Sequence, residues 1–432
     1  MEYLKKIFTD HILYSRATGI DNLDQNAFKA QLNEQVDIVS RKVLAGTYCF
    51  TKYKLKLVSK GRNKIPREIS IPTVRDRIVL RSLCNFLTDI YQGTIAFDLP
   101  QNIIRRLKND LDSNNYSACI KLDVANFYPS VKHKELISRV GKKIRNAEIK
   151  ALICSAISTP TVSFSRKSDK LACQGVPQGL AVSNILAAIY LINIDKHLAA
   201  NEKIKYYRYV DDVLIFCDES EASEIATDVI KKFRRIGLEV YDPKKVPEKS
   251  SVGLVTEGFD YLGYHFADGL VTVRTGSVAR LKESLVSIFT SYKYSKKKSK
   301  EFLLWRLNLR VTGCIYENKS KGWLFFFSEI NDEALLHTLD HYIKKLIKRF
   351  DVDINPKKFV RAFKELSHRK YETNYIPNFD NYELDQQREV LIKYFGLDIK
   401  EYPNEKIEFE FKKRLSKQIK DLQVDVIGFS YH

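Results

Sequence analysis

The chain has 432 residues, of which 44% are hydrophobic and 29% are charged, a composition that excludes a mainly disordered protein. Its 72 lysine and arginine residues outnumber the 53 aspartate and glutamate residues, and the net charge of +19 indicates a polyanionic partner. Apolar runs are too short for a membrane span, the first residues do not resemble a signal peptide, and the seven cysteines form no CxxC pair. We therefore expect a cytoplasmic protein with no membrane partner, zinc ribbon or disulfide framework.

The first third of the chain predicts helices and one hairpin. Residues 1–45 have a helical composition, and residues 47–57 and 67–71 predict two strands around a basic turn. Apolar side chains recur at helical spacing over residues 72–87.

Strands and helices then alternate, which indicates an α+β sheet domain covered by helices. The expected strands lie at 116–124 and in two arms within 205–216, and the expected helices at 132–157, 180–198 and 221–236. A short hairpin is expected at 261–266 and 270–274. After residue 278, lysine-rich helices are expected at 279–309 and 332–349, followed by a charged, mostly helical tail.

Two adjacent carboxylates, Asp211 and Asp212, lie between β-prone arms in the segment YYRYVDDVLIF. A tight hairpin would place both at an exposed tip, where their like charges need a cation. Such oxygen ligands select Mg²⁺ or Mn²⁺. Adjacent acids are frequent by chance in this composition, so the apolar arms make the pair informative.

Two further segments lie upstream. The strand pattern ACIKLDVANFY contains Asp123, which would suit a metal site or a helix cap. The segment QGVPQGLAVS at 174–183 precedes an apolar helix. Glycine lets a ligand approach the backbone, and a helix N-terminus favours anions, although an ordinary loop is the alternative.

Together these three segments resemble the palm of a reverse transcriptase, in the order that the family shows. FDYLGY at 259–264 resembles the primer-grip region, and REISIP at 67–72 with DRIV at 76–79 is similar to the fingers motif. The resemblance implies an α+β right-hand polymerase: fingers, a palm whose antiparallel sheet is backed by helices, and a helical thumb. The expected domains are 1–115 (N-terminal helices and fingers), 116–270 (palm, with part of the fingers at 132–175), 271–350 (thumb) and 351–432 (a small, mostly helical extension).

The resemblance also implies site residues. Asp123 and Asp211 would bind two Mg²⁺ ions, with Asp212 as a supporting carboxylate and Mn²⁺ as a substitute. The implied contacts to the incoming nucleotide are Arg67, Lys60, Val124, Tyr128, Gln178 and Lys245, for which Lys244 is the alternative. Tyr128 would exclude a ribose 2′-hydroxyl by its bulk. The implied contacts to primer and template are Tyr209, Leu262, Gly263, Lys296, Lys297 and Lys298, although these lysines would equally suit a solvated face.

The implied function is RNA-directed DNA polymerisation, with an RNA template, a DNA product and deoxynucleoside triphosphates as partners. Among bacterial enzymes of the group II intron and retron lineage, GWLFFF at 322–327 and YIPNFD at 375–380 resemble the defence-associated, anti-phage reverse transcriptases. Several of that group copy or bind a structured noncoding RNA. The Asn-Ala-x-x-His signature of retrons is missing from this chain.

Three alternatives stay open. They are a protein-primed or untemplated polymerase of the abortive-infection type, a retron or group II intron-derived enzyme, and an RNA-binding protein with a retained palm. The sequence also leaves open a homo-oligomer and a defence partner protein. The aromatic residues at 322–327 would suit a hydrophobic core as well as nucleic-acid stacking.

Overall fold

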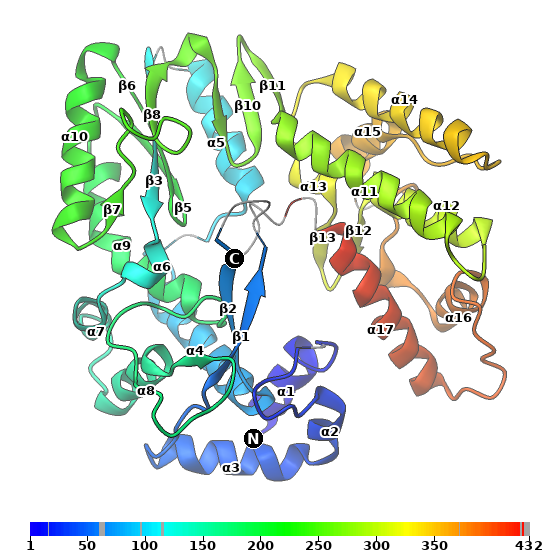
Figure 1. The fold of residues 1–432 in the computed structure, drawn as a ribbon, viewed down its shortest axis with the longest axis horizontal. Coiled ribbons are helices and arrows are strands. Elements are labelled where there is room, and N and C mark those ends of the chain that lie inside the picture. Colours follow the sequence, from blue (N-terminus) through cyan, green and yellow to red (C-terminus); the bar gives the residue numbers. More distant parts are fainter. Residues whose placement is uncertain are drawn as a thin grey trace. The chain divides into compact units, whose positions relative to one another are not determined.

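The computed structural model describes residues 1–15, 17–59, 65–95, 97–113, 116–370, 372–423 and 426. The chain divides into two compact units. The first comprises Met1–Phe97 and Tyr116–Gly253, and the second comprises Asp98–Asn115 and Leu254–His432. Helices and mainly antiparallel sheets alternate along the chain (Figure 1), which confirms the predicted α+β class. None of the described helices is long and apolar enough to cross a bilayer.

A sheet with the strand order β5-β6-β3-β7 forms part of the largest core of the first unit. Its strands are β3 (Ala118–Ala125), β5 (Lys205–Tyr209), β6 (Asp212–Cys217) and β7 (Glu239–Val240), and β8 (Ser251–Leu254) also pairs with β3. Helices α9 (Ser183–Ala199) and α10 (Glu219–Arg235) add buried side chains to this core. The predicted apolar helix and the two predicted β arms are thereby confirmed.

The predicted hairpin is formed by β1 (Tyr53–Val58) and β2 (Arg67–Ile71), and β4 (Thr161–Val162) pairs with β1 in parallel. The first strand begins at Tyr53 rather than at residue 47, because the preceding segment is bound to helix α4 (Val74–Tyr91). The Tyr48 hydroxyl donates to Asp76 Oδ1 at 2.7 Å, and the Thr51 N–H donates to Asp76 Oδ2 at 3.1 Å.

The remaining helices of the first unit precede the hairpin or follow β3. Those that precede it are α1 (Glu2–His11), α2 (Gln25–Ala30) and α3 (Leu32–Leu44). The short α6 (Phe127–Ser130) follows β3, and the expectation of one helix over 132–157 is wrong. The chain forms α7 (His133–Gly141) and α8 (Ala147–Ser158) instead, because Asn146 accepts the Ile149 N–H at 2.9 Å and begins a new helix.

The second unit contains two small antiparallel sheets. One has β9 (Phe259–Tyr261), β10 (Tyr264–Ala267) and β11 (Leu270–Val273), which confirms the predicted hairpin and adds a strand. The other has β12 (Cys314–Tyr316) and β13 (Lys319–Lys321), which the sequence patterns did not predict.

The helices of the second unit follow these sheets. They are α11 (Thr275–Lys293), α12 (Lys300–Thr312), α13 (Trp323–Phe326), α14 (Glu333–Phe350), α15 (Phe359–Arg369), α16 (Leu384–Lys393) and α17 (Asn404–Leu422). The single helix expected at 279–309 is therefore two helices. Ser299 Oγ accepts the Phe302 N–H at 3.0 Å and begins α12, directly after the basic run.

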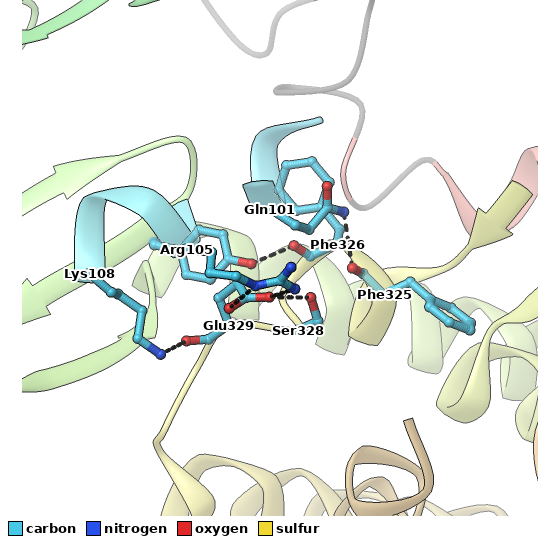
Figure 2. Close-up of polar contacts among 8 residues, drawn as sticks. Gln101, Arg105, Lys108, Phe325, Phe326, Ser328 and Glu329 are labelled. Atoms are coloured by element: carbon cyan, nitrogen blue, oxygen red, sulfur yellow. Dashed lines mark hydrogen bonds and ion pairs between the residues drawn. The ribbon is translucent and has the colours of Figure 1, made fainter. Parts of the chain in front are cut away.

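Helix α5 (Pro100–Ser113) lies in the sequence between the two parts of the first unit, yet its polar contacts join it to residues 325–329 (Figure 2). Arg105 contacts both carboxylate oxygens of Glu329, with the shorter N–O distance at 2.6 Å. Lys108 Nζ donates to the Glu329 carbonyl at 2.9 Å, and Gln101 Nε2 donates to the Phe325 carbonyl at 3.0 Å. These contacts explain why α5 belongs to the second unit.

Candidate active site

Three carboxylates converge at one end of the first unit's sheet. The antiparallel pairing of β3 with β6 sets Asp123 directly opposite Asp212, and Asp211 lies in the tight turn between β5 and β6. The Val124 N–H donates to the Asp211 carbonyl at 3.3 Å, which joins the turn to β3. Val210 adopts a positive φ of 58°, a strained conformation for a β-branched residue.

Burial and the neighbouring negative charges raise the pKa of two of the three carboxylates. Burial, followed by the negative charge of Asp123, raises the pKa of Asp211. Burial, followed by the charges of Asp211 and Asp123, raises the pKa of Asp212 to about 7. Negative charge is therefore concentrated here without full compensation, which is the electrostatic setting of a cation site.

The donor chemistry fits a hard divalent ion, since carboxylate oxygens are the ligands that Mg²⁺ prefers. Within the described part of the chain, however, no three side chains from His, Cys, Asp and Glu are arranged to ligate a metal together. Asp123 Oδ2 instead receives Lys249 Nζ at 2.8 Å. The acids thus fit an ion by chemistry, with an ammonium group bound to one of them.

Lys249 and Ser250 are site residues that the sequence reasoning missed. The Asp123 N–H donates to Ser250 Oγ at 3.0 Å, and the Ser250 side chain is fully buried. Lys245, or Lys244, stays the predicted contact to the incoming nucleotide, and Lys249 is the lysine that contacts Asp123. A Lys-Ser pair just before a short strand pattern was the available signal, and the pairing of β8 with β3 explains its position.

A buried network also supports the turn. Arg208 Nε donates to Asp195 Oδ1 at 2.7 Å, and Tyr206 donates to the same oxygen at 2.8 Å. Arg208 Nη1 donates to the Val210 carbonyl at 2.8 Å. The guanidinium thus joins helix α9, through Asp195, to the strained residue of the turn. Sequence patterns did not indicate either member of this ion pair.

The predicted gate residue Tyr128 lies on α6, where it is 7% exposed. Its hydroxyl donates to Asn184 Oδ1 at 2.7 Å, which fixes the direction of the ring. Its carbonyl accepts the Val176 N–H at 2.8 Å, so the ring is tied to the QGVPQG loop. Electrostatic coupling of Tyr128 with Asp211 and Arg67 shows that these predicted residues share one neighbourhood.

The Gln178–Gly179 segment lies against strand β2, which begins with Arg67. The Ser70 N–H donates to the Gln178 carbonyl at 2.7 Å. Gly179 has a φ of 101°, and a Cβ there would lie 2.8 Å from Ile69 Cγ2 and 3.0 Å from the Ser70 carbonyl. Only glycine permits this close approach. The predicted loop and the predicted fingers strand are therefore neighbours.

The other predicted residues divide into three groups. Val124 is buried next to Asp123, and Tyr209 pairs with Asp212 across the hairpin. Leu262, Gly263 and the exposed Lys296–Lys298 belong to the second unit, where Leu262 and Gly263 form the positive-φ turn between β9 and β10. Lys60 lies outside the described residues.

Comparison with known proteins assigns the domain. Residues 58–266 match the family described as "Reverse transcriptase (RNA-dependent DNA polymerase)". The chain is 23% identical over 294 residues to Protein YkfC of Escherichia coli (strain K12), covering 57% of this chain and 74% of that protein. It is 31% identical over 189 residues to the Retron Se72 reverse transcriptase of Salmonella heidelberg (strain 579083-10), covering 41% of this chain and 45% of that protein.

Solved telomerase structures show a distant likeness. Apo telomerase from Candida tropicalis has a TM-score of 0.44 at 13% identity, with coverage of 93% of this chain and 71% of that chain. Telomerase from Candida albicans, in complex with a TWJ fragment of telomeric RNA, has a TM-score of 0.42 at 14% identity, with coverage of 95% and 71%.

The matched segment contains the three acids, Arg67 and the loop around Gly179, all in the first unit. These predicted residues therefore lie within the part of the chain that the family match covers. Residues 58–266, slightly less than half of the chain, are therefore similar to the reverse transcriptase (RNA-dependent DNA polymerase) family.

Proposed function

We propose that the protein adds deoxynucleotides to a primer 3′-hydroxyl by phosphoryl transfer at Asp123, Asp211 and Asp212. The observation on which the proposal rests is the register of β3 and β6, which sets Asp123 opposite Asp212 with Asp211 in the adjoining turn. Three carboxylates from two separate segments thereby meet inside the part of the chain that the family match covers.

Asp123 and Asp211 would hold two Mg²⁺ ions, with Mn²⁺ as a substitute, and Asp212 would support them. When bound, such ions stabilise the attacking and leaving oxygens of an in-line displacement. The raised pKa values of Asp211 and Asp212 support this assignment, because added positive charge would favour their ionised forms.

Lys249 is the proposed partner of the acids before a nucleotide enters. Burial lowers the pKa of Lys249, but the hydrogen bond and charge of Asp123 outweigh burial and raise it. The ammonium therefore stays charged and reduces repulsion among the acids. Released from Asp123, the same group would be available to the pyrophosphate leaving group.

Arg67 and Tyr128 are the proposed nucleotide contacts. Arg67 begins β2, and its charge acts on both Asp211 and Tyr128. A guanidinium here would bind the triphosphate and stabilise the charge that develops on it. The Tyr128 ring, fixed by Asn184, would lie under the sugar and exclude a 2′-hydroxyl.

The polymerase is proposed to copy a structured noncoding RNA in anti-phage defence. The resemblance of residues 322–327 and 375–380 to defence-associated reverse transcriptases supports this proposal, and the net charge of +19 supports an RNA partner. Sequencing the RNA and DNA that co-purify with the protein should recover one abundant folded transcript with DNA complementary to it. Recovery of bulk cellular RNA alone would oppose a dedicated template.

Polymerisation itself is tested with a primed RNA template, Mg²⁺ and labelled deoxynucleotides. Asp211→Asn should reduce incorporation by about 100-fold or more, because it removes a ligand charge at the reacting phosphate. Asp228→Asn, an exposed change on α10, is the matched control and should leave the rate unchanged. Equal incorporation by the Asp211→Asn variant and the wild type would contradict the site assignment.

A further inference from the structure

The second unit contains a cavity of about 450 Å³ that the proposed polymerase site does not use. Helices α12 and α16 line it together with Lys357 and Pro377. Its volume lies in the range of small-molecule sites, which is about 300 to 1,000 Å³. Polar and apolar side chains contribute to the lining in similar measure, so the cavity is not simply a gap in a hydrophobic core.

Aromatic rings form one wall of the cavity. Trp305 and Tyr394 are stacked, with ring centroids 5.3 Å apart and planes inclined by 21°, and Tyr382 also lines the space. All three rings are partly exposed. Within the described part of the chain, the hydroxyls of Tyr382 and Tyr394 have no hydrogen-bond partner. Such a wall suits a planar ligand that stacks and also accepts or donates a hydrogen bond.

The polar lining consists of two side-chain amides, two carboxylates, two lysines and one threonine. Asn308 Oδ1 already accepts the Lys357 N–H at 2.7 Å, and Gln386 Oε1 accepts the Glu383 N–H at 3.0 Å. Each amide therefore retains its NH₂ group as a donor, while Glu389, whose Oε1 receives Lys393 Nζ at 3.5 Å, keeps its second carboxylate oxygen as an acceptor. Donors and acceptors beside stacking rings match the edge of a purine base, which presents both.

A basic, exposed segment leads directly to this cavity. Lys296, Lys297, Lys298 and Lys300 immediately precede Glu301, the first lining residue, and all four are exposed. Tyr294, just before them, is 76% exposed. Proteins that bind single-stranded nucleic acids combine lysines that contact the phosphate backbone with aromatic rings on which the bases stack.

We propose that the cavity binds one unpaired purine base of a single-stranded RNA, while the phosphates of that strand contact Lys296–Lys300. The inference rests on the proposed function only in taking nucleic acid as the partner. It adds a binding site within α12 and α16 that is separate from the residues of the polymerase site.

The direct test is photo-crosslinking of the full chain to an unstructured pyrimidine RNA that carries one 8-azidoadenosine, without nucleotides or Mg²⁺. Peptide mapping should find the adduct on Trp305, Tyr382 or Tyr394. Adducts confined to Tyr294 or to the first unit would overturn the proposal and leave the cavity to another class of ligand, such as a peptide.

Two substitutions test the same site by affinity for this RNA. Tyr394→Ser should weaken binding by about 5- to 100-fold, the usual effect of losing one base-stacking ring, whereas Tyr394→Phe should restore most of it. Gln386→Glu keeps an oxygen that accepts the Glu383 N–H but replaces the side-chain NH₂ donor with a negatively charged oxygen. The variant should therefore fold normally and still bind this RNA more weakly. Gln92→Glu, an exposed change just after α4, is the matched control. Unchanged affinity of both Tyr394→Ser and Gln386→Glu would refute the site.

The polymerase assignment is tested separately in the same experiments. The Asp211→Asn protein should crosslink at the cavity as the wild type does, since the base site lies in the second unit. For the wild-type protein, a normal crosslink without polymerisation would count only against the proposed function. Polymerisation without a crosslink at the cavity would count only against the base site.

Discussion

At the scale of single residues, Tyr128 gives the sharpest prediction about substrate choice. Tyr128→Ala removes the ring that would meet a 2′-hydroxyl, so ribonucleotide use should rise relative to deoxynucleotide use, by about 10-fold or more. The measurement is kcat/KM for a matched deoxynucleotide and ribonucleotide. Tyr128→Phe, which keeps the ring but loses the hydroxyl that is bonded to Asn184, is the control and should keep discrimination. Unchanged discrimination in the alanine variant would remove Tyr128 as the gate.

Asp76 gives a prediction about stability. Its buried carboxylate accepts from Tyr48, Thr51 and Thr73, and its loss would leave two buried hydroxyls and the part-buried Thr51 N–H without an acceptor. Asp76→Ala should therefore lower the free energy of unfolding by about 3 kcal/mol. Denaturant titration measures this change, with the exposed Asp89→Ala on the same helix as control. A loss no larger than that of the control would show that the donors find other partners.

At the scale of elements, the β5–β6 turn depends on the neighbouring Arg208–Asp195 pair. Arg208→Lys keeps the charge but cannot bridge Asp195 and the Val210 carbonyl in the same way. A displaced turn should lower kcat by about 100-fold with little change in KM for the template. Arg234→Lys, an exposed change on α10, is the control. A KM effect without a kcat effect would exclude this positioning role.

Helix α5 gives an element-scale prediction through its contacts with Glu329. The Glu329 side chain is only 11% exposed, whereas that of Arg105 is 60% exposed, so the ion pair is partly screened. Arg105→Met should cost about 1 kcal/mol and speed amide hydrogen exchange in residues 100–113. Arg106→Met, whose partner is Asp98, is the neighbouring control. Equal amide hydrogen exchange rates in the two variants would mean that the contacts with Glu329 do not stabilise α5.

The sequence predicted those elements and site residues whose position follows from local pattern. Asp123 and Asp211 were recognisable because each adjoins an apolar strand. Lys249 and Arg208 were not, because the first reaches Asp123 through the pairing of β8 with β3, and the second acts through Asp195 on a helix 13 residues upstream. These side-chain contacts depend on tertiary packing, which cannot be predicted from patterns in a single sequence. The break between α7 and α8 was missed for a local reason, the cap at Asn146.

At the scale of the whole molecule, charge is distributed unevenly along the chain. Residues 351–432 contain 15 basic and 15 acidic residues, so the whole excess of +19 lies before residue 351. Replacing Lys296, Lys297 and Lys298 with Glu should weaken RNA binding and reduce its salt dependence, by about 0.7 in log–log slope for each phosphate that is no longer neutralised. The same change at Lys406, Lys417 and Lys420 of α17 is the control. If RNA binding keeps its affinity and salt dependence when Lys296, Lys297 and Lys298 are replaced, these lysines do not contact the RNA.

The placement of α5 also limits how the protein can be divided. Because residues 98–115 belong with the second unit while both flanks belong with the first, the backbone passes between the units three times. A truncation ending at Gly253 would retain α5 but delete Glu329 and the rest of its binding partners, leaving Ile103, Ile104 and Leu107 without cover. Such a fragment should be poorly soluble, so a polymerase domain cut at the end of the first unit is a poor choice for expression.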